Sequence, residues 1–166
     1  EEDCDGENLK HLFRELDLCP HYAVICEPSD NRLVTGHKGK AQVLIKTQGR
    51  SAHGSAPEKG MNAIYEMAQI IERIKEQDNR LRAGDPPHGT LVASRISSKS
   101  ESLNAVPFEC EIYLDRRMVM GETKATIKRE MDALVKGKKA AWEIGTLKRR
   151  SWTGMNLTYE PFHLPW

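Results

Sequence analysis

Carboxylates near the start of the chain have the types and the spacing of a hydrolytic metal site. Glu1 and Glu2 are adjacent, and Glu27 opens a Glu-Pro-Ser turn. Carboxylate oxygens bind zinc and hard divalent cations, and a carboxylate beside such a ligand can take a proton from a metal-bound water. By spacing alone, adjacent acids are most often solvent-exposed side chains. The pair therefore indicates hydrolysis only together with other features of the chain.

Two elements would position Glu27. Residues 6–17 carry apolar side chains at helical spacing and predict a short helix. Residues 22–26 form a nearly unbroken apolar run, which is typical of a strand buried on both faces. Glu27 would then lie at the carboxyl end of that strand, where ligands collect in open α/β sheets.

Residues 41–148 predict the order β-α-β-β-α-β. The expected strands are 41–47, 90–97, 108–117 and 140–148, and the expected second helix is 123–135. The first helix follows the loop 49–60, precedes a polar connector over 78–88, and has an apolar stripe of Met61, Ile64, Met67, Ala68, Ile71 and Ile74. This order predicts a ferredoxin-like fold of mixed α/β class, an antiparallel four-stranded sheet with both helices on one face.

The flanking segments predict a second, incomplete domain. One helix and one buried strand cannot form a sheet by themselves, and the aromatic residues after 149 need a surface to pack on. We therefore expect a complete small domain at 40–148, inserted between 1–39 and 149–166, which are two parts of a larger domain.

Composition excludes several classes of protein. The 25 basic and 24 acidic residues give a formal net charge of +1, so there is no electrostatic case for nucleic acid. No apolar run reaches the roughly 18 residues of a membrane span, and the acidic start is unlike a signal peptide. The four cysteines include no C-x-x-C pair, which favours reduced thiols and a cytoplasmic location.

The run GRSAHGSAPEKGMNAI at residues 49–64 is the most specific motif of the chain. Together with the acidic pair, the Glu27 turn and Asp115-Arg116-Arg117, it resembles the dizinc amidohydrolase and metallopeptidase family, which includes glutamate carboxypeptidases, acetylornithine deacetylase and succinyl-diaminopimelate desuccinylase. The words EEDCDG at 1–6, GET at 121–123 and SWTG at 151–154 are most similar to a branch of hydrolases assigned to selenium metabolism. The resemblance covers essentially the whole chain.

The resemblance implies a role for six residues. Glu1 matches the general base, and Glu2 and Glu27 match carboxylate ligands of the two metals. The other three matches lie in the inserted domain, which is the lid or dimerisation domain of the family. His53 matches a lid histidine that reaches the active site of the opposite subunit and binds the substrate or the developing oxyanion. Asn104 and Arg117 match a substrate-contacting asparagine and an arginine that grips a substrate carboxylate.

These lid residues also have structural interpretations. His53 could be a solvated loop histidine, although the start of the following helix offers partial positive charge to an anion. Asn104 could serve only as a turn former. Arg117 ends a strand and could pair with an acid such as Glu122.

The resemblance predicts a metal-dependent hydrolase acting on a small peptide or an N-acyl amino acid, with two zinc ions, or cobalt or manganese instead, and a homodimer formed through the lid. An upstream H-x-D segment and a late histidine ligand of the family find no match here. Two carboxylates hold a metal only loosely, so we expect little hydrolysis by this chain alone. The alternative is a non-catalytic ferredoxin-like module that dimerises or binds a small ligand, because this fold hosts many functions.

Overall fold

The computed structural model describes residues 6–22, 24, 26, 28–151 and 154–166. The chain forms two compact units. The larger contains residues 37–145 and 161–166, and the smaller contains residues 1–36 and 146–160. The domain boundaries expected from the sequence, after 39 and after 148, stay a prediction. In the structure, residues 161–166 return to the larger unit.

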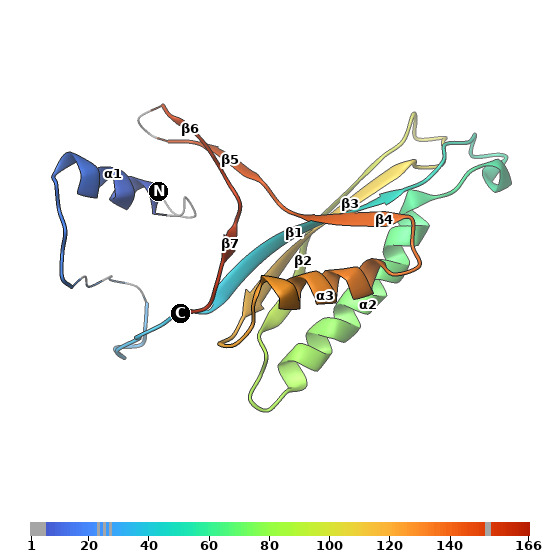
Figure 1. Cartoon of the computed structure of the whole chain (residues 1–166). Coiled ribbons are helices and arrows are strands. Elements are labelled where there is room, and N and C mark those ends of the chain that lie inside the picture. Colours follow the sequence, from blue (N-terminus) through green and yellow to red (C-terminus); the bar gives the residue numbers. More distant parts are fainter. Residues whose placement is uncertain (1–5, 23, 25, 27, 152–153) are drawn as a thin grey trace. The chain divides into compact units, whose positions relative to one another are not determined.

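The larger unit is an antiparallel sheet covered by helices on one face (Figure 1). Its main strands lie in the order β2-β3-β1-β4, and their bounds are β1 Gly39–Gln48, β2 Thr90–Lys99, β3 Glu109–Met118 and β4 Ala140–Ile144. A short strand, β7 Phe162–His163, pairs with the start of β1. The covering helices are α2 Ala63–Ala83 and α3 Lys124–Val135, and the 3-10 turn η1 Pro57–Lys59 precedes α2. The predicted ferredoxin-like arrangement is confirmed.

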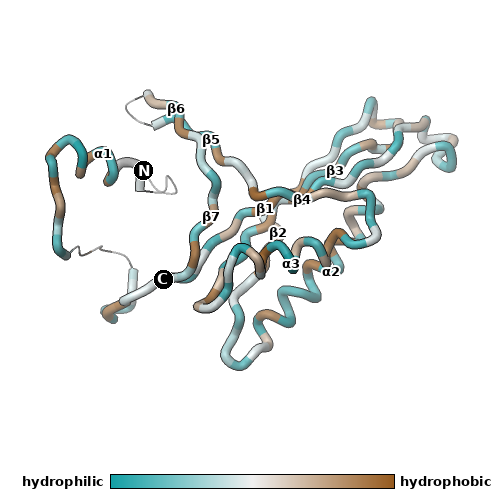
Figure 2. Tube along the Cα trace, in the orientation of Figure 1, coloured by the Kyte–Doolittle hydropathy of each residue, from teal (hydrophilic) through white to brown (hydrophobic). Residues whose placement is uncertain are grey.

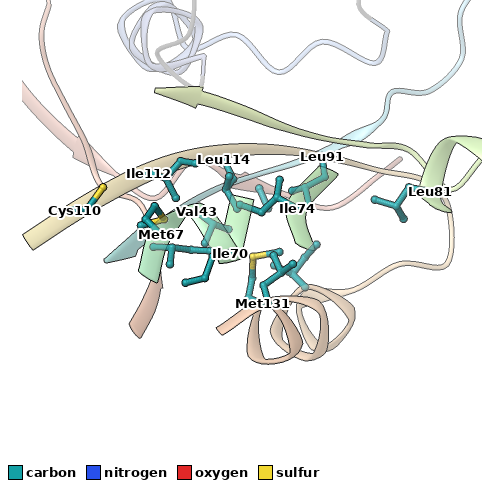
Figure 3. Close-up of a cluster of buried hydrophobic side chains, with 14 of the residues drawn as sticks. Val43, Met67, Ile70, Ile74, Leu81, Leu91, Cys110, Ile112, Leu114 and Met131 are labelled. Atoms are coloured by element: carbon teal, nitrogen blue, oxygen red, sulfur yellow. The ribbon is translucent and has the colours of Figure 1, made fainter. Parts of the chain in front are cut away.

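Alternation along β1 and β3 builds the core. Every second residue of these strands faces the helices and is buried, as in Val43, Ile45, Ile112 and Leu114. The helices contribute buried side chains at helical spacing: Met67, Ile70 and Ile74 of α2, and Ile127, Met131 and Leu134 of α3. Figure 3 shows part of this cluster, with Met67, Ile70, Ile74 and Met131 beside side chains of the strands. Each fully buried apolar side chain contributes about 1.5–3 kcal/mol, so this cluster stabilises the unit.

Helix α2 is longer than the sequence analysis predicted. Residues 78–83, expected in a polar connector, are helical, because Leu81 continues the buried stripe seven residues after Ile74. The predicted stripe also divides between two surfaces. Met67 and Ile74 are buried, whereas Ile64 and Ala68 lie on the exposed side of the helix.

The predicted final strand over 140–148 is also wrong in extent, because it ends at Ile144. Gly145 leaves the strand, and its N–H donates to the carbonyl oxygen of Gln42. A Cβ at this glycine would lie 2.5 Å from the Tyr113 hydroxyl oxygen, so any other residue here would force the Tyr113 ring to move. The next strand, β5 Leu147–Arg150, belongs to the smaller unit.

The smaller unit contains α1 Glu7–Glu15 and a two-stranded antiparallel sheet of β5 with β6 Asn156–Tyr159. The helix predicted over 6–17 is confirmed with slightly trimmed ends. The predicted buried strand over 22–26 is not found. Its described residues have no strand conformation, and Tyr22 and Val24 are 93% and 92% exposed. A strand buried on both faces needs neighbours, and among the described residues no strand pairs with this segment.

Apolar side chains of the smaller unit line an open hollow of about 540 Å³. Its lining residues are Leu9, Phe13, Leu18, Cys19, Pro20, Tyr22 and Val24. Hydrophobic segments along this part of the trace are visible in Figure 2. The described cysteines, Cys19, Cys26 and Cys110, are free thiols. In the described part of the chain, no helix combines the length and the hydropathy that crossing a bilayer requires.

Candidate functional site

His53 and Asn104 meet on two loops at one end of the large sheet. The Val106 N–H donates to the carbonyl oxygen of Ala52 at 2.8 Å, and the Gly54 N–H donates to that of Asn104 at 2.6 Å. His53 and Ala105 thereby form an isolated antiparallel bridge. A Cβ at Gly54 would lie 2.7 Å from the Asn104 carbonyl oxygen, so this close approach requires glycine. The backbones of the two loops that carry these predicted substrate-binding residues are therefore joined.

The His53 side chain is exposed, and hydrogen bonds with Ser55 hold its ring. Its Nδ1 atom lies 2.8 Å from the Ser55 hydroxyl oxygen and accepts the Ser55 N–H at 3.2 Å. The backbone closes a turn below the ring, because the Ala56 N–H donates to the His53 carbonyl oxygen at 2.9 Å. The ring is thus anchored to the loop at one edge.

The expectation that a helix start beside His53 supplies positive charge is not supported. Only the three-residue η1 follows the histidine closely, and α2 begins at Ala63. The Asn62 side chain caps α2 by accepting the Ile64 N–H at 2.9 Å, which satisfies one of the N–H groups that an anion would use.

Arg117 lies at the other end of the sheet. It is near the end of β3, whereas Asn104 precedes the start of that strand. Eight residue steps of β3 separate Glu109 from Arg117, which at ~3.3 Å per residue is about 26 Å. One chain therefore does not bring Arg117 to the same place as His53 and Asn104.

The Arg117 guanidinium pairs with a carboxylate two residues earlier. Its Nε and Nη2 atoms donate to Asp115 at 2.7 and 3.1 Å, and both side chains lie on the sheet face away from the helices. The partner suggested by the sequence, Glu122, instead pairs with Arg116. Asp115 uses only one edge of the guanidinium fork, so the Nη1/Nη2 edge can still bind a carboxylate.

Arg116 is the charged residue that the sequence analysis missed. Its side chain is fully buried and donates from Nε and Nη2 to Glu130 at 2.9 Å each, and from Nη2 to Glu122 at 2.5 Å. The Nη1 atom donates to the carbonyl oxygens of His88, at 3.1 Å, and of Arg117. Burial disfavours the charged form, but the carboxylates of Glu130 and Glu122 more than compensate and raise the pKa of Arg116. The strand alternation, which places Arg116 between buried Leu114 and Met118, was the available signal.

A second charged group occupies the open sheet face nearer the His53 end. Lys46 pairs with Glu111 at 2.8 Å across β1 and β3, and Lys99 pairs with Glu109 at 2.5 Å across β2 and β3. The hydrogen bond from Lys46 lowers the pKa of Glu111, and the same bond raises the pKa of Lys46. In each pair the two residues lie directly opposite each other on neighbouring strands. Because the pairs are partly exposed, each contributes little to stability.

The three carboxylates predicted to act with the metal, Glu1, Glu2 and Glu27, lie outside the described residues. Among the residues that the structure does describe, no group of three or more His, Cys, Asp or Glu side chains could hold a metal ion. The described part of the chain thus supplies the lid residues and no metal centre.

Comparison with known proteins likewise separates the lid residues from the predicted metal-site carboxylates. Residues 35–143 match the family model of the peptidase dimerisation domain. The chain belongs to this family. The match contains His53, Asn104 and Arg117 and excludes the three predicted metal-site carboxylates.

Relatives of this chain include longer proteins, among them a deacetylase. The uncharacterized protein YgeY of Escherichia coli strain K12 is 36% identical over 169 residues, covering 100% of this chain and 42% of YgeY. The acetylornithine deacetylase of Proteus mirabilis is 30% identical over 148 residues, covering 86% of this chain and 38% of the deacetylase. A crystal structure of a candidate aminohydrolase from methicillin-resistant Staphylococcus aureus matches with a TM-score of 0.55 and 26% identity, covering 65% of this chain and 30% of that one. The chain thus spans about two fifths of these curated relatives.

Proposed function

We propose that this chain is a segment of a metal-dependent amidohydrolase or peptidase that hydrolyses an amide bond in a small peptide or an N-acyl amino acid. The observation that carries the proposal is the backbone bridge that joins the loops of His53 and Asn104 on a peptidase dimerisation domain. The relative from Proteus mirabilis supports the substrate class, because its name describes removal of an acetyl group from an amino acid.

The lid residues would bind and orient the substrate. His53 would donate a hydrogen bond to the carbonyl oxygen as negative charge develops on it, and Asn104 would contact the substrate beside it. Arg117 would grip a substrate carboxylate through the guanidinium edge that Asp115 leaves open. This division of roles favours substrates that carry both an amide and a carboxylate.

Two copies of the chain would be needed for one site. About 26 Å of strand separates the His53 end of the sheet from Arg117, which exceeds the reach of a small peptide or an N-acyl amino acid. We infer that His53 and Asn104 of one subunit act with Arg117 of another. The lid would then be a working part of the site as well as a dimer contact.

The edge of the sheet at β2 suits such a dimer. This strand pairs with β3 on one side, and no strand lies on its other side in the described part of the chain. Ile96 of β2 is 54% exposed, and α2, which packs on β2, exposes Ile64 and Tyr65. An open edge flanked by apolar side chains needs cover, and a second copy of the lid would provide it.

The metal centre belongs to the part of the site outside the described residues. Glu2 and Glu27 would hold the divalent ions, two zinc ions or cobalt or manganese instead, and Glu1 would serve as general base. Metal ions supply an activated water for attack on an amide when they are bound. Two carboxylates fall short of the three protein ligands of a catalytic zinc site, so we propose that the chain alone has little or no hydrolytic activity.

A second candidate is a non-catalytic dimerisation or ligand-binding module. It is favoured by the match to a domain defined by dimerisation and by the lack of a metal-binding cluster among the described residues. In that case His53 would have no role in any chemistry.

One substitution separates the two functions. In the complete enzyme proposed to contain this segment, His53→Ala should abolish most hydrolysis of N-acyl amino acids, with dimerisation intact by light scattering. His88→Ala is the matched control, because His88 is also exposed and contributes its backbone carbonyl, not its ring, to the Arg116 network. Unchanged turnover in the His53 variant would refute the catalytic proposal and support the module.

A further inference from the structure

The contacts of His53 fix which of its ring nitrogens carries the proton. A backbone N–H can only donate a hydrogen bond. Because the Ser55 N–H points to Nδ1 at 3.2 Å, that nitrogen must offer its lone pair. The Ser55 hydroxyl, 2.8 Å from the same atom, can then donate as well. A neutral ring with its Nδ1 lone pair engaged carries its proton on Nε2.

We propose that Ser55 is a positioning residue that holds neutral His53 as the Nε2–H tautomer, so that the ring presents a hydrogen-bond donor to an oxygen of the ligand. The identity of that ligand, a polarised carbonyl or a carboxylate, rests on the proposed function. The tautomer itself rests only on the two contacts between Ser55 and Nδ1.

This assignment restricts what His53 can do. A histidine that binds a metal or takes a proton through Nε2 needs a lone pair on that nitrogen, and then Nδ1 carries the proton. The Ser55 N–H occupies the Nδ1 lone pair and opposes that arrangement. His53 is therefore built as a donor to a negatively charged oxygen, and not as a metal ligand or a general base acting through Nε2.

The backbone of the loop holds His53, and with it the Nε2–H donor, in a fixed position. The Ala56 N–H closes the turn on the His53 carbonyl oxygen, and the Gly54 N–H ties the same turn to Asn104. Donors aimed in advance at developing charge stabilise it more effectively than donors that must reorganise. The Ser55 contacts supply the remaining constraint, which is the rotation and protonation of the imidazole.

Nitrogen NMR of the 166-residue chain tests the tautomer without any metal or substrate. At a pH where His53 is neutral, we expect a protonated-type shift at Nε2 and an unprotonated-type shift at Nδ1. Ser55→Ala keeps the backbone N–H but loses the hydroxyl, so the preference for the Nε2–H form should fall by roughly fivefold, the worth of one hydrogen bond. Ser55→Thr should restore it.

Ser51→Ala is the matched control, because Ser51 lies in the same loop and its buried hydroxyl has no hydrogen-bond partner among the described residues. This variant should leave the His53 resonances unchanged. A proton on Nδ1 in the wild-type chain, or identical His53 spectra for wild type and Ser55→Ala, would overturn the proposal.

Kinetics of the complete enzyme give an independent readout. Ser55→Ala should lower kcat with little change in KM, because the donor acts on charge that develops in the transition state. The loss should stay below the roughly fivefold fall in the tautomer ratio, because kcat follows the population of the Nε2–H form. If the NMR result holds while His53→Ala leaves turnover unchanged, the proposed function fails and the positioning role stands. If His53→Ala abolishes turnover while Nδ1 carries the proton, the function stands and the positioning role is refuted.

Discussion

Removal of Glu130 tests the buried ion pair between Glu130 and Arg116. The Arg116 side chain is fully buried, and Glu130 accepts two of its hydrogen bonds at 2.9 Å. Among the described residues, Glu130→Ala would leave Glu122 as the carboxylate that still pairs with the guanidinium. Breaking a buried ion pair by removing one partner costs about 3–5 kcal/mol, because the other charge is left uncompensated. We expect the free energy of unfolding to fall by about 3 kcal/mol.

Urea and thermal unfolding of the chain, followed by circular dichroism, measure this loss, which should lower Tm by roughly 10 °C. Glu76→Ala is the matched control, since Glu76 faces Arg80 at 4.0 Å on the exposed side of α2 and should cost less than about 0.5 kcal/mol.

A double substitution sharpens the test. Arg116→Met with Glu130→Ala should recover part of the loss, because the fully buried guanidinium is gone and the carboxylate that loses its partner, Glu122, is 12% exposed and still accepts the Val119 N–H. A Glu130→Ala effect no larger than that of Glu76→Ala would refute the reasoning that the buried guanidinium depends on its carboxylate.

Three further predictions concern the substrate, pH and assembly. If the complete protein is the hydrolase proposed above, Asp115→Ala should raise KM about tenfold for a substrate carboxylate, because the guanidinium of Arg117 is no longer oriented. The KM for the matching carboxamide should not change, and steady-state kinetics measure both. The pKa of Glu111 is lowered by Lys46, so this pair stabilises the fold above the ordinary carboxyl pKa, and its contribution is lost as pH falls below that range. The difference in stability between wild type and Glu111→Gln should therefore vanish in acid unfolding experiments, and a constant difference would contradict the assignment. Ile96→Asp on the open edge of β2 should convert a dimer to a monomer by light scattering, and an unchanged mass would exclude this edge as the dimer contact.

The elements of the lid could be predicted because their signals are local. Strands β1 and β3 alternate buried and exposed residues, and α2 and α3 repeat apolar residues at helical spacing. The motif around His53 also identified the family, which the match over residues 35–143 confirms. The assignments of Glu1, Glu2 and Glu27 stay predictions.

Errors arose where an element depends on partners distant in the sequence. The apolar run over 22–26 fits a buried strand by pattern, yet among the described residues nothing pairs with it. Helix α2 continues to Ala83 because Leu81 packs into the core. The mostly polar composition of residues 78–88 gives no local sign of this contact. Arg117 was assigned a role from its place at the end of a strand, whereas the neighbouring Arg116 is buried and forms the hydrogen bonds to Glu130 and Glu122.

By itself the sequence determined the strands, the helices, the loop motif and the family, because side-chain alternation and turn chemistry act over a few residues. Only the tertiary structure decided that His53 meets Asn104, about fifty residues later in the chain, and that Arg117 lies at the far end of the sheet. The physical reason is register. Antiparallel pairing of β1 with β3 fixes which loops share an end of the sheet, and this pairing joins residues too distant in the sequence for any local pattern to specify.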